Sequence, residues 1–99
     1  MNKFLIAALL VLSACTTPGP SSDPELANVT WSCPGGKFFN ARIGATWAII
    51  LADGHTYHMT AARSADGSRY RGDGAEYWEH AGEAMLHGAS GGPYESCHH

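Results

Sequence analysis

Turn-forming glycines recur at short intervals through the second half of the chain, and they limit the segments between them to short strands. Glycine follows aspartate at Asp53-Gly54, Asp66-Gly67 and Asp73-Gly74, and it follows alanine at Ala81-Gly82. Such dipeptides suit tight turns, in which a positive φ is needed. Short strands with turn signals about every 8–12 residues are typical of an antiparallel sandwich or barrel. We expect a small barrel, because closure removes the exposed edges that invite pairing with neighbours.

Alternation of side chains assigns the inner faces of the expected strands. We expect strands at residues 38–43, 47–51, 56–60, 68–71, 75–78 and 84–87. In the first of these, three apolar positions alternate with a mixed outer face: Phe39, Ala41 and Ile43. The second is apolar throughout, so both of its faces can be buried. Because the Asp53-Gly54 turn sets the register, we expect these residues to face one another across the hairpin: Trp47, Ile49, Leu51, Tyr57 and Met59.

Residues 1–14 have the features of a bacterial lipoprotein signal peptide. A basic start with Lys3 precedes an apolar run at residues 4–12, which is too short to span a membrane core of about 30 Å. The segment Leu12-Ser13-Ala14-Cys15 then resembles the lipobox of bacterial lipoproteins. The resemblance implies that Cys15 is alkylated with diacylglycerol, that the chain is cut before it, and that the new amine is acylated. Several acyl chains, palmitate among them, anchor a protein more firmly than one. The alternative is an ordinary secretory signal with a chance cysteine.

Residues 15–27 are expected to form a flexible linker from the lipidated cysteine to a single domain at residues 28–99. The linker has three prolines, small polar residues and little to bury. Thr16, rather than an acid, follows the cysteine. By resemblance to Gram-negative lipoproteins, this implies anchoring at the periplasmic face of the outer membrane.

Cys33 and Cys97 bracket nearly the whole expected domain. With Cys15 lipidated, these two cysteines remain in an oxidising compartment, where a disulfide is expected. A bridge closing a loop of about 65 residues would contribute roughly 4 kcal/mol by the chain-entropy estimate. The alternative is two free thiols, or two metal ligands assisted by nearby histidines.

Composition disfavours several classes of function. A net charge of −3 argues against nucleic-acid binding and is compatible with a basic protein partner. No Ser, His and Asp residues are spaced as a catalytic set, and so small a domain has little room for a lined pocket. We therefore expect no enzyme, no catalytic residue and no cofactor. Six histidines leave a metal-binding protein as an alternative, but their spacing is poor, and no metal site is expected.

Four segments in fixed order carry a resemblance to a known family. The first two are Trp31-Ser32-Cys33 with Gly36, and the hairpin residues 48–59. The last two are the loop Ser64-Ala65-Asp66-Gly67-Ser68-Arg69-Tyr70, and Tyr77-Trp78 followed by Glu83-Ala84 and Leu86, with Cys97 closing. Together they resemble the membrane-bound inhibitors of c-type lysozyme over residues 31–97. The resemblance implies an eight-stranded antiparallel barrel that binds c-type lysozyme and plugs its cleft.

The resemblance implies that the positions of Asp66 and His80 meet the catalytic carboxylates of the enzyme, and residues around them are further candidates for lysozyme binding. The candidates are Ser64, Asp66, Gly67, Ser68, Arg69, Tyr70, Trp78 and His80. Two of them depart from the family, because Asp66 replaces a serine and His80 replaces a lysine; Ala81 also stands where glycine is usual. A carboxylate directed at catalytic carboxylates is unfavourable, and a histidine is only partly cationic at pH 7. These departures leave open an envelope lipoprotein of the same fold with another partner. The oligomeric state is also left open.

Overall fold

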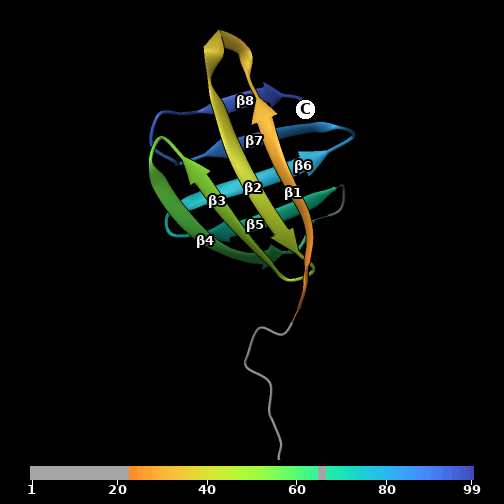
Figure 1. Cartoon of the computed structure of the whole chain (residues 1–99). Coiled ribbons are helices and arrows are strands. Elements are labelled where there is room, and N and C mark those ends of the chain that lie inside the picture. The colour runs from red at the N-terminus through yellow and green to blue at the C-terminus, as the bar shows by residue number, and fades with distance from the viewer. Residues whose placement is uncertain (1–22, 65–66) are drawn as a thin grey trace, which may run out of the picture.

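Eight antiparallel strands follow one another around a single sheet in the order β1 to β8 (Figure 1). The structure, a computed structural model, describes residues 23–64 and 67–99; the signal peptide, Cys15, most of the expected linker and Asp66 lie outside these ranges. The strands are β1 (Glu25–Ser32), β2 (Phe38–Gly44), β3 (Trp47–Ala52), β4 (His55–Ala62), β5 (Ser68–Gly72), β6 (Ala75–His80), β7 (Glu83–His87) and β8 (Tyr94–Cys97), with a short 3-10 helix η1 (Pro34–Gly36). The prediction of an all-β, eight-stranded antiparallel barrel is confirmed. In the described part of the chain, no helix is long and apolar enough to cross a membrane.

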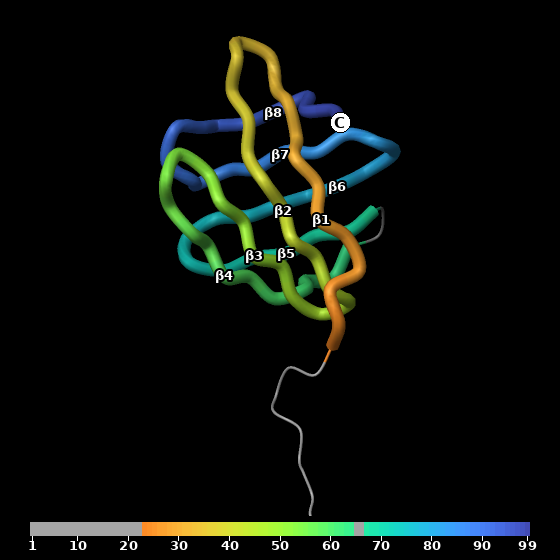
Figure 2. The backbone as a smooth tube through the Cα atoms, viewed as in Figure 1, coloured from red at the N-terminus to blue at the C-terminus, as the bar shows by residue number. Residues whose placement is uncertain are grey.

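The first and last strands close the barrel at one point. Ser32 and His98 form an isolated bridge, with N–H to carbonyl oxygen distances of 2.7 and 2.8 Å in the two directions. The predicted disulfide between Cys33 and Cys97 lies next to this bridge, with the two Cα atoms 4.1 Å apart. In Figure 2 the β1–β2 hairpin runs across the direction of β5–β8. Closure therefore depends on residues from opposite ends of the domain.

Large aromatic side chains from four strands fill the interior. Trp31, Phe39 and Tyr77 are fully buried, and Tyr94 nearly so. The Phe39 ring meets Tyr77 and Tyr94 edge-on, at centroid distances of 5.9 and 5.4 Å, which is a favourable arrangement for aromatic pairs. The inner positions predicted for β2 are confirmed, since Phe39, Ala41 and Ile43 are all buried.

The face predicted for β3 is wrong by one residue. Ala48 and Ile50 are buried, whereas Trp47 is half-buried on the outside and Leu51 is 50% exposed. The register pairs Ile50 with Tyr57, and residues directly opposite share a face. Tyr57 and Met59 do face the core, as predicted, so their partners on β3 are the even-numbered residues rather than the three that were expected. Small alanines fit the inner face of β3 because the large aromatic side chains already fill the interior of the barrel.

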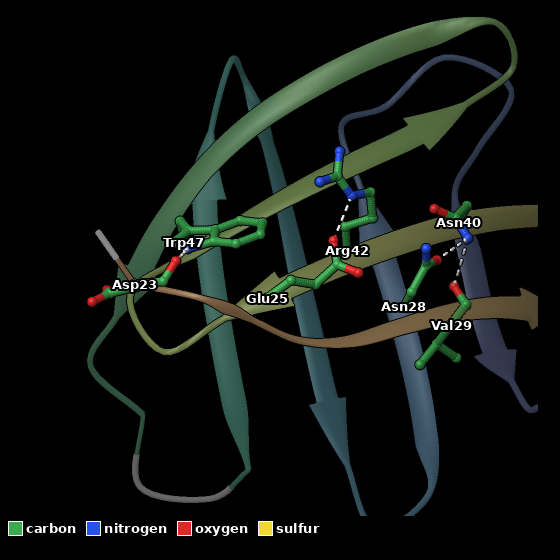
Figure 3. A network of polar contacts seen from close by, with 7 residues as sticks. All are labelled: Asp23, Glu25, Asn28, Val29, Asn40, Arg42 and Trp47. Carbon is green, nitrogen blue, oxygen red and sulfur yellow. Dashed lines mark hydrogen bonds and ion pairs between the residues drawn. The ribbon is translucent and has the colours of Figure 1, made fainter. Parts of the chain in front are cut away.

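Polar contacts on the outer face fasten the start of β1 to β2. The Arg42 Nε atom lies 2.7 Å from a Glu25 carboxylate oxygen, and the Asn40 amide donates to Asn28 Oδ1 at 2.9 Å (Figure 3). Pairing on β1 thus begins at Glu25, ahead of residue 28. The Trp47 indole N–H donates to the carbonyl oxygen of Asp23 at 3.1 Å, so contacts with the sheet begin even before the strand does.

Candidate functional site

The connection from β4 to β5 packs directly on the end of β6. Gly67 has a φ of +74°, and a Cβ atom there would lie 2.2 Å from the carbonyl oxygen of Glu79 and 3.1 Å from the Cα of His80. Any larger residue would push the two segments apart, which explains the glycine. The structure therefore brings two candidate residues together, Gly67 from the loop and His80 from β6. Asp66 precedes this contact and lies outside the described residues.

Three candidate side chains form a continuous row on the outer face, which we call the outer row: Arg69, Trp78 and His80. Arg69 and Trp78 are cross-strand partners, and the guanidinium carbon lies 5.4 Å from the centre of a Trp78 ring. On its own strand, Trp78 stacks with His80 at 5.9 Å and an interplanar angle of 26°. The indole thus holds one permanent cation and one titratable imidazole along the same surface.

Two arginines and one glutamate lie beside one another around the outer row. Arg69 Nε lies 2.9 Å from Glu76 Oε2, and Arg71 Nε lies 3.9 Å from the same oxygen. Two permanent cations therefore share one carboxylate, and these partly exposed pairs are worth little in stability. The chain as a whole has a net charge of −3, so a surface with two neighbouring arginines stands out as one that could attract a negatively charged target.

Other candidates lie behind the outer row rather than in it. Tyr70 is buried, its ring stacks with that of Tyr77, and its hydroxyl donates to the Gly44 carbonyl oxygen at 3.2 Å. Burial raises the pKa of Tyr70, and the negative charge of Glu79 raises it further. Tyr70 is therefore part of the core, where it joins β5 to β6 and to the end of β2. Ser68 begins β5 as an exposed residue opposite Glu79, and half-buried Ser64 precedes the undescribed pair 65–66.

Sequence reasoning missed Glu79, whose side chain lies on the inner side of β6 at the same end of the barrel. The Tyr77 hydroxyl donates to Glu79 Oε1 at 3.1 Å and accepts from the Trp31 indole N–H at 3.0 Å. Burial raises the pKa of Tyr77 far above its usual value, and the charge of Glu79 raises it further. The alternation of side chains along a strand could have identified Glu79, because a residue two positions after an inward-facing tyrosine also faces inward.

The two-residue turn after His80 has alanine, rather than glycine, at its first position, yet both of its residues have a positive φ. Ala81 has a φ of +53° and is followed by Gly82 at +82°. A left-handed conformation costs an alanine roughly 1 kcal/mol, so the tight turn is maintained against a small local penalty. The departure at Ala81 therefore leaves the position of His80 at the end of β6 intact.

Two of the histidines in the described ranges lie beside glutamates, and none belongs to a group that could hold a metal ion. Across 23–64 and 67–99, no three His, Cys, Asp or Glu side chains gather as a group that could hold a metal ion. His87 Nε2 lies 2.7 Å from a Glu95 oxygen, and His98 Nε2 lies 3.6 Å from a Glu83 oxygen. Both pairs join β8 or its C-terminal extension to β7. Both pairs are largely exposed to solvent, so each contributes little to stability.

The sequence profile of one protein family matches residues 31–94, from the buried Trp31 of β1 to Tyr94 of β8. Its description is membrane-bound lysozyme-inhibitor of c-type lysozyme. The chain belongs to this family. The resemblance drawn from four sequence segments is thereby confirmed, and the family is one of inhibitors rather than enzymes. No match was found among curated proteins or among solved structures.

Membership of the lysozyme-inhibitor family implies a partner for the protein. The family description names c-type lysozyme as the target and the membrane as the location. Every described candidate residue lies inside the matched range, from Ser64 to His80.

Proposed function

We propose that this lipoprotein is anchored through Cys15 to the periplasmic face of the outer membrane and inhibits c-type lysozyme with the β4–β5 loop and the outer row. The observation that carries the proposal is the packing of Gly67 on Glu79 and His80, which joins the loop to a cationic, aromatic surface at one end of the barrel. The loop is the element proposed to enter the active-site cleft.

The chemistry of the enzyme explains why such a surface would inhibit it. Glycoside hydrolysis by lysozyme needs one protonated carboxyl group and one ionised carboxylate in the cleft. A cation presented to the ionised carboxylate would pair with it and exclude the sugar. Arg69 provides a charge at any relevant pH, whereas an imidazole such as that of His80 adds one only when it is protonated. Asp66 opposes both, since its carboxylate would repel those of the enzyme when ionised.

Inhibition measured at two pH values tests the loop mechanism. We expect the unaltered protein to inhibit a c-type lysozyme more strongly at pH 5.5 than at pH 8, because imidazole loses its charge across that interval while an aspartate keeps its own. The double variant Asp66→Ser with His80→Lys should bind about 5- to 150-fold more tightly at pH 8, corresponding to roughly 1–3 kcal/mol. His58→Lys is the matched control, because His58 is exposed on the outer face of β4.

Two results would contradict the loop mechanism. A folded double variant that inhibits at neither pH value would show that the loop is not the inhibitory element. An equal gain from His58→Lys would show that added positive charge acts without regard to position. The alternative proposal, that the same barrel binds another partner in the envelope, would then replace the loop mechanism.

Fractionation of cells tests the anchor. Cys15→Ser removes the thiol that would be alkylated, so the variant should move to the soluble periplasmic fraction or stay unprocessed. Lysozyme inhibition by the released protein should be unchanged in solution. Retention of the variant with outer membranes after a high-salt wash would refute the lipid anchor.

A further inference from the structure

Glu79 differs from every other glutamate in the described ranges in having no ionic partner. Four of the five form ion pairs with arginine or histidine: Glu25, Glu76, Glu83 and Glu95. Within residues 23–64 and 67–99, the contact found for the Glu79 carboxylate is the hydrogen bond from the Tyr77 hydroxyl. A half-buried carboxylate held by one neutral donor is poorly compensated for the water it has lost.

The position of Glu79 links this charge to the binding end of the barrel. The residue lies on β6 between Trp78 and His80, directly opposite Ser68 on β5. Its carbonyl oxygen is the atom on which Gly67 packs. The outer row and the carboxylate thus occupy the two faces of one short segment, next to the loop.

The side chain is held in place from the core. Trp31 and Tyr77 are both fully buried, and the chain of hydrogen bonds from the Trp31 indole through the Tyr77 hydroxyl ends on Glu79 Oε1. A group fixed in this way loses little conformational freedom when it pairs with a partner. The second oxygen of the carboxylate accepts no hydrogen bond from the described residues, and the residue is only half-buried.

We propose that Glu79 is a specificity-determining residue, whose carboxylate pairs with an arginine or lysine side chain at the rim of the lysozyme cleft. The inference rests on the lysozyme-inhibitor function proposed above and extends it. The inhibitor then presents charges of both signs to the enzyme. Its arginine and histidine pair with the catalytic carboxylates, and Glu79 pairs with a basic side chain nearby. A lysozyme without a basic residue at that point binds less tightly, so the pair selects among c-type lysozymes.

The variant Glu79→Gln isolates the charge. Glutamine keeps an acceptor oxygen for the Tyr77 hydroxyl, so the interior is preserved while the negative charge is removed. Glu95→Gln is the matched control, because it removes the same charge from exposed β8, where the pair with His87 is worth little. Both variants are compared with the unaltered full chain, purified in detergent, by measuring Kd for one c-type lysozyme at low and high salt.

We expect Glu79→Gln to raise Kd by about 5- to 50-fold at low salt and to flatten its salt dependence. Glu95→Gln should stay within about twofold of the unaltered chain, and neither variant should unfold at lower denaturant. Neutralising rim arginines and lysines of the lysozyme one at a time should identify one whose loss weakens the unaltered inhibitor but not Glu79→Gln. Equal affinities of Glu79→Gln and the unaltered chain would overturn this inference alone. Failure of the unaltered chain to bind would overturn the proposed function and this inference with it.

Discussion

Replacing Tyr77 by phenylalanine removes one oxygen atom from the centre of a buried polar chain. The ring remains, so packing against Phe39 and Tyr70 is kept, while the acceptor of the Trp31 indole N–H and the donor to Glu79 are both lost. Trp31 is 0% exposed, so water cannot easily replace the acceptor. A buried donor without a partner costs about 1–3 kcal/mol, and loss of the bond to the half-buried carboxylate adds roughly 0.5–1 kcal/mol. We therefore expect Tyr77→Phe to lower the free energy of unfolding by about 2–4 kcal/mol.

Urea unfolding followed by tryptophan fluorescence measures this loss, and Tyr57→Phe provides the comparison. The Tyr57 hydroxyl accepts a hydrogen bond from the Ser90 N–H at 2.8 Å near the surface, where water can take its place. The same chemical change there should cost below about 1 kcal/mol. A loss from Tyr77→Phe no greater than that from Tyr57→Phe would refute the reasoning, because the buried indole would then have no need of its partner.

Three further predictions concern the barrel itself. Reduction of the Cys33–Cys97 disulfide, which spans 64 residues, should lower the free energy of unfolding by about 4 kcal/mol, and intact-mass analysis after alkylation without reductant should detect no free thiol at either cysteine. Ile50→Ala should cost about 2–5 kcal/mol in denaturant unfolding and Trp47→Ala below about 2 kcal/mol, because only the first is fully buried; the opposite order would restore the other face of β3. The raised pKa values of Tyr70 and two other buried tyrosines stabilise the fold below pH 10, the value in the unfolded chain, and that stability is lost as pH rises above 10. Unfolding free energies measured from pH 8 to about pH 11 should fall accordingly, and a free energy of unfolding that stays constant over this range would contradict the prediction.

The strand pattern and the hairpin turns were predictable because each depends on a few neighbouring residues. Asp53 has a φ of +51° and Gly54 of +76°, as an aspartate-glycine turn requires, and strict alternation on β2 identified its inner face. The face of β3 could not be assigned in this way. All its side chains are apolar, so alternation carries no information, and the outcome depends on which neighbours already fill the interior.

Candidate residues could be named from the sequence, but their arrangement in space could not. Sequence comparison placed Arg69, Trp78 and His80 among the contacts, but only the cross-strand register shows that they form one row. Tyr70 was grouped with them although its side chain points inward. Glu79 was overlooked because its two neighbours face outward, and its own environment comes from Tyr77 and Trp31, which lies far away in the chain.

The order of the strands around the barrel has a consequence for how the protein is made. Each strand pairs with the next one in sequence, so seven of the eight seams are local and can form as short hairpins before the whole domain is available. The remaining seam joins Ser32 to His98, and Cys33 finds its partner at Cys97. Neither contact can form until nearly the last residue has been delivered. Oxidation of the cysteine pair therefore marks a closed barrel, and a chain that lacks β8 would leave Cys33 without its partner.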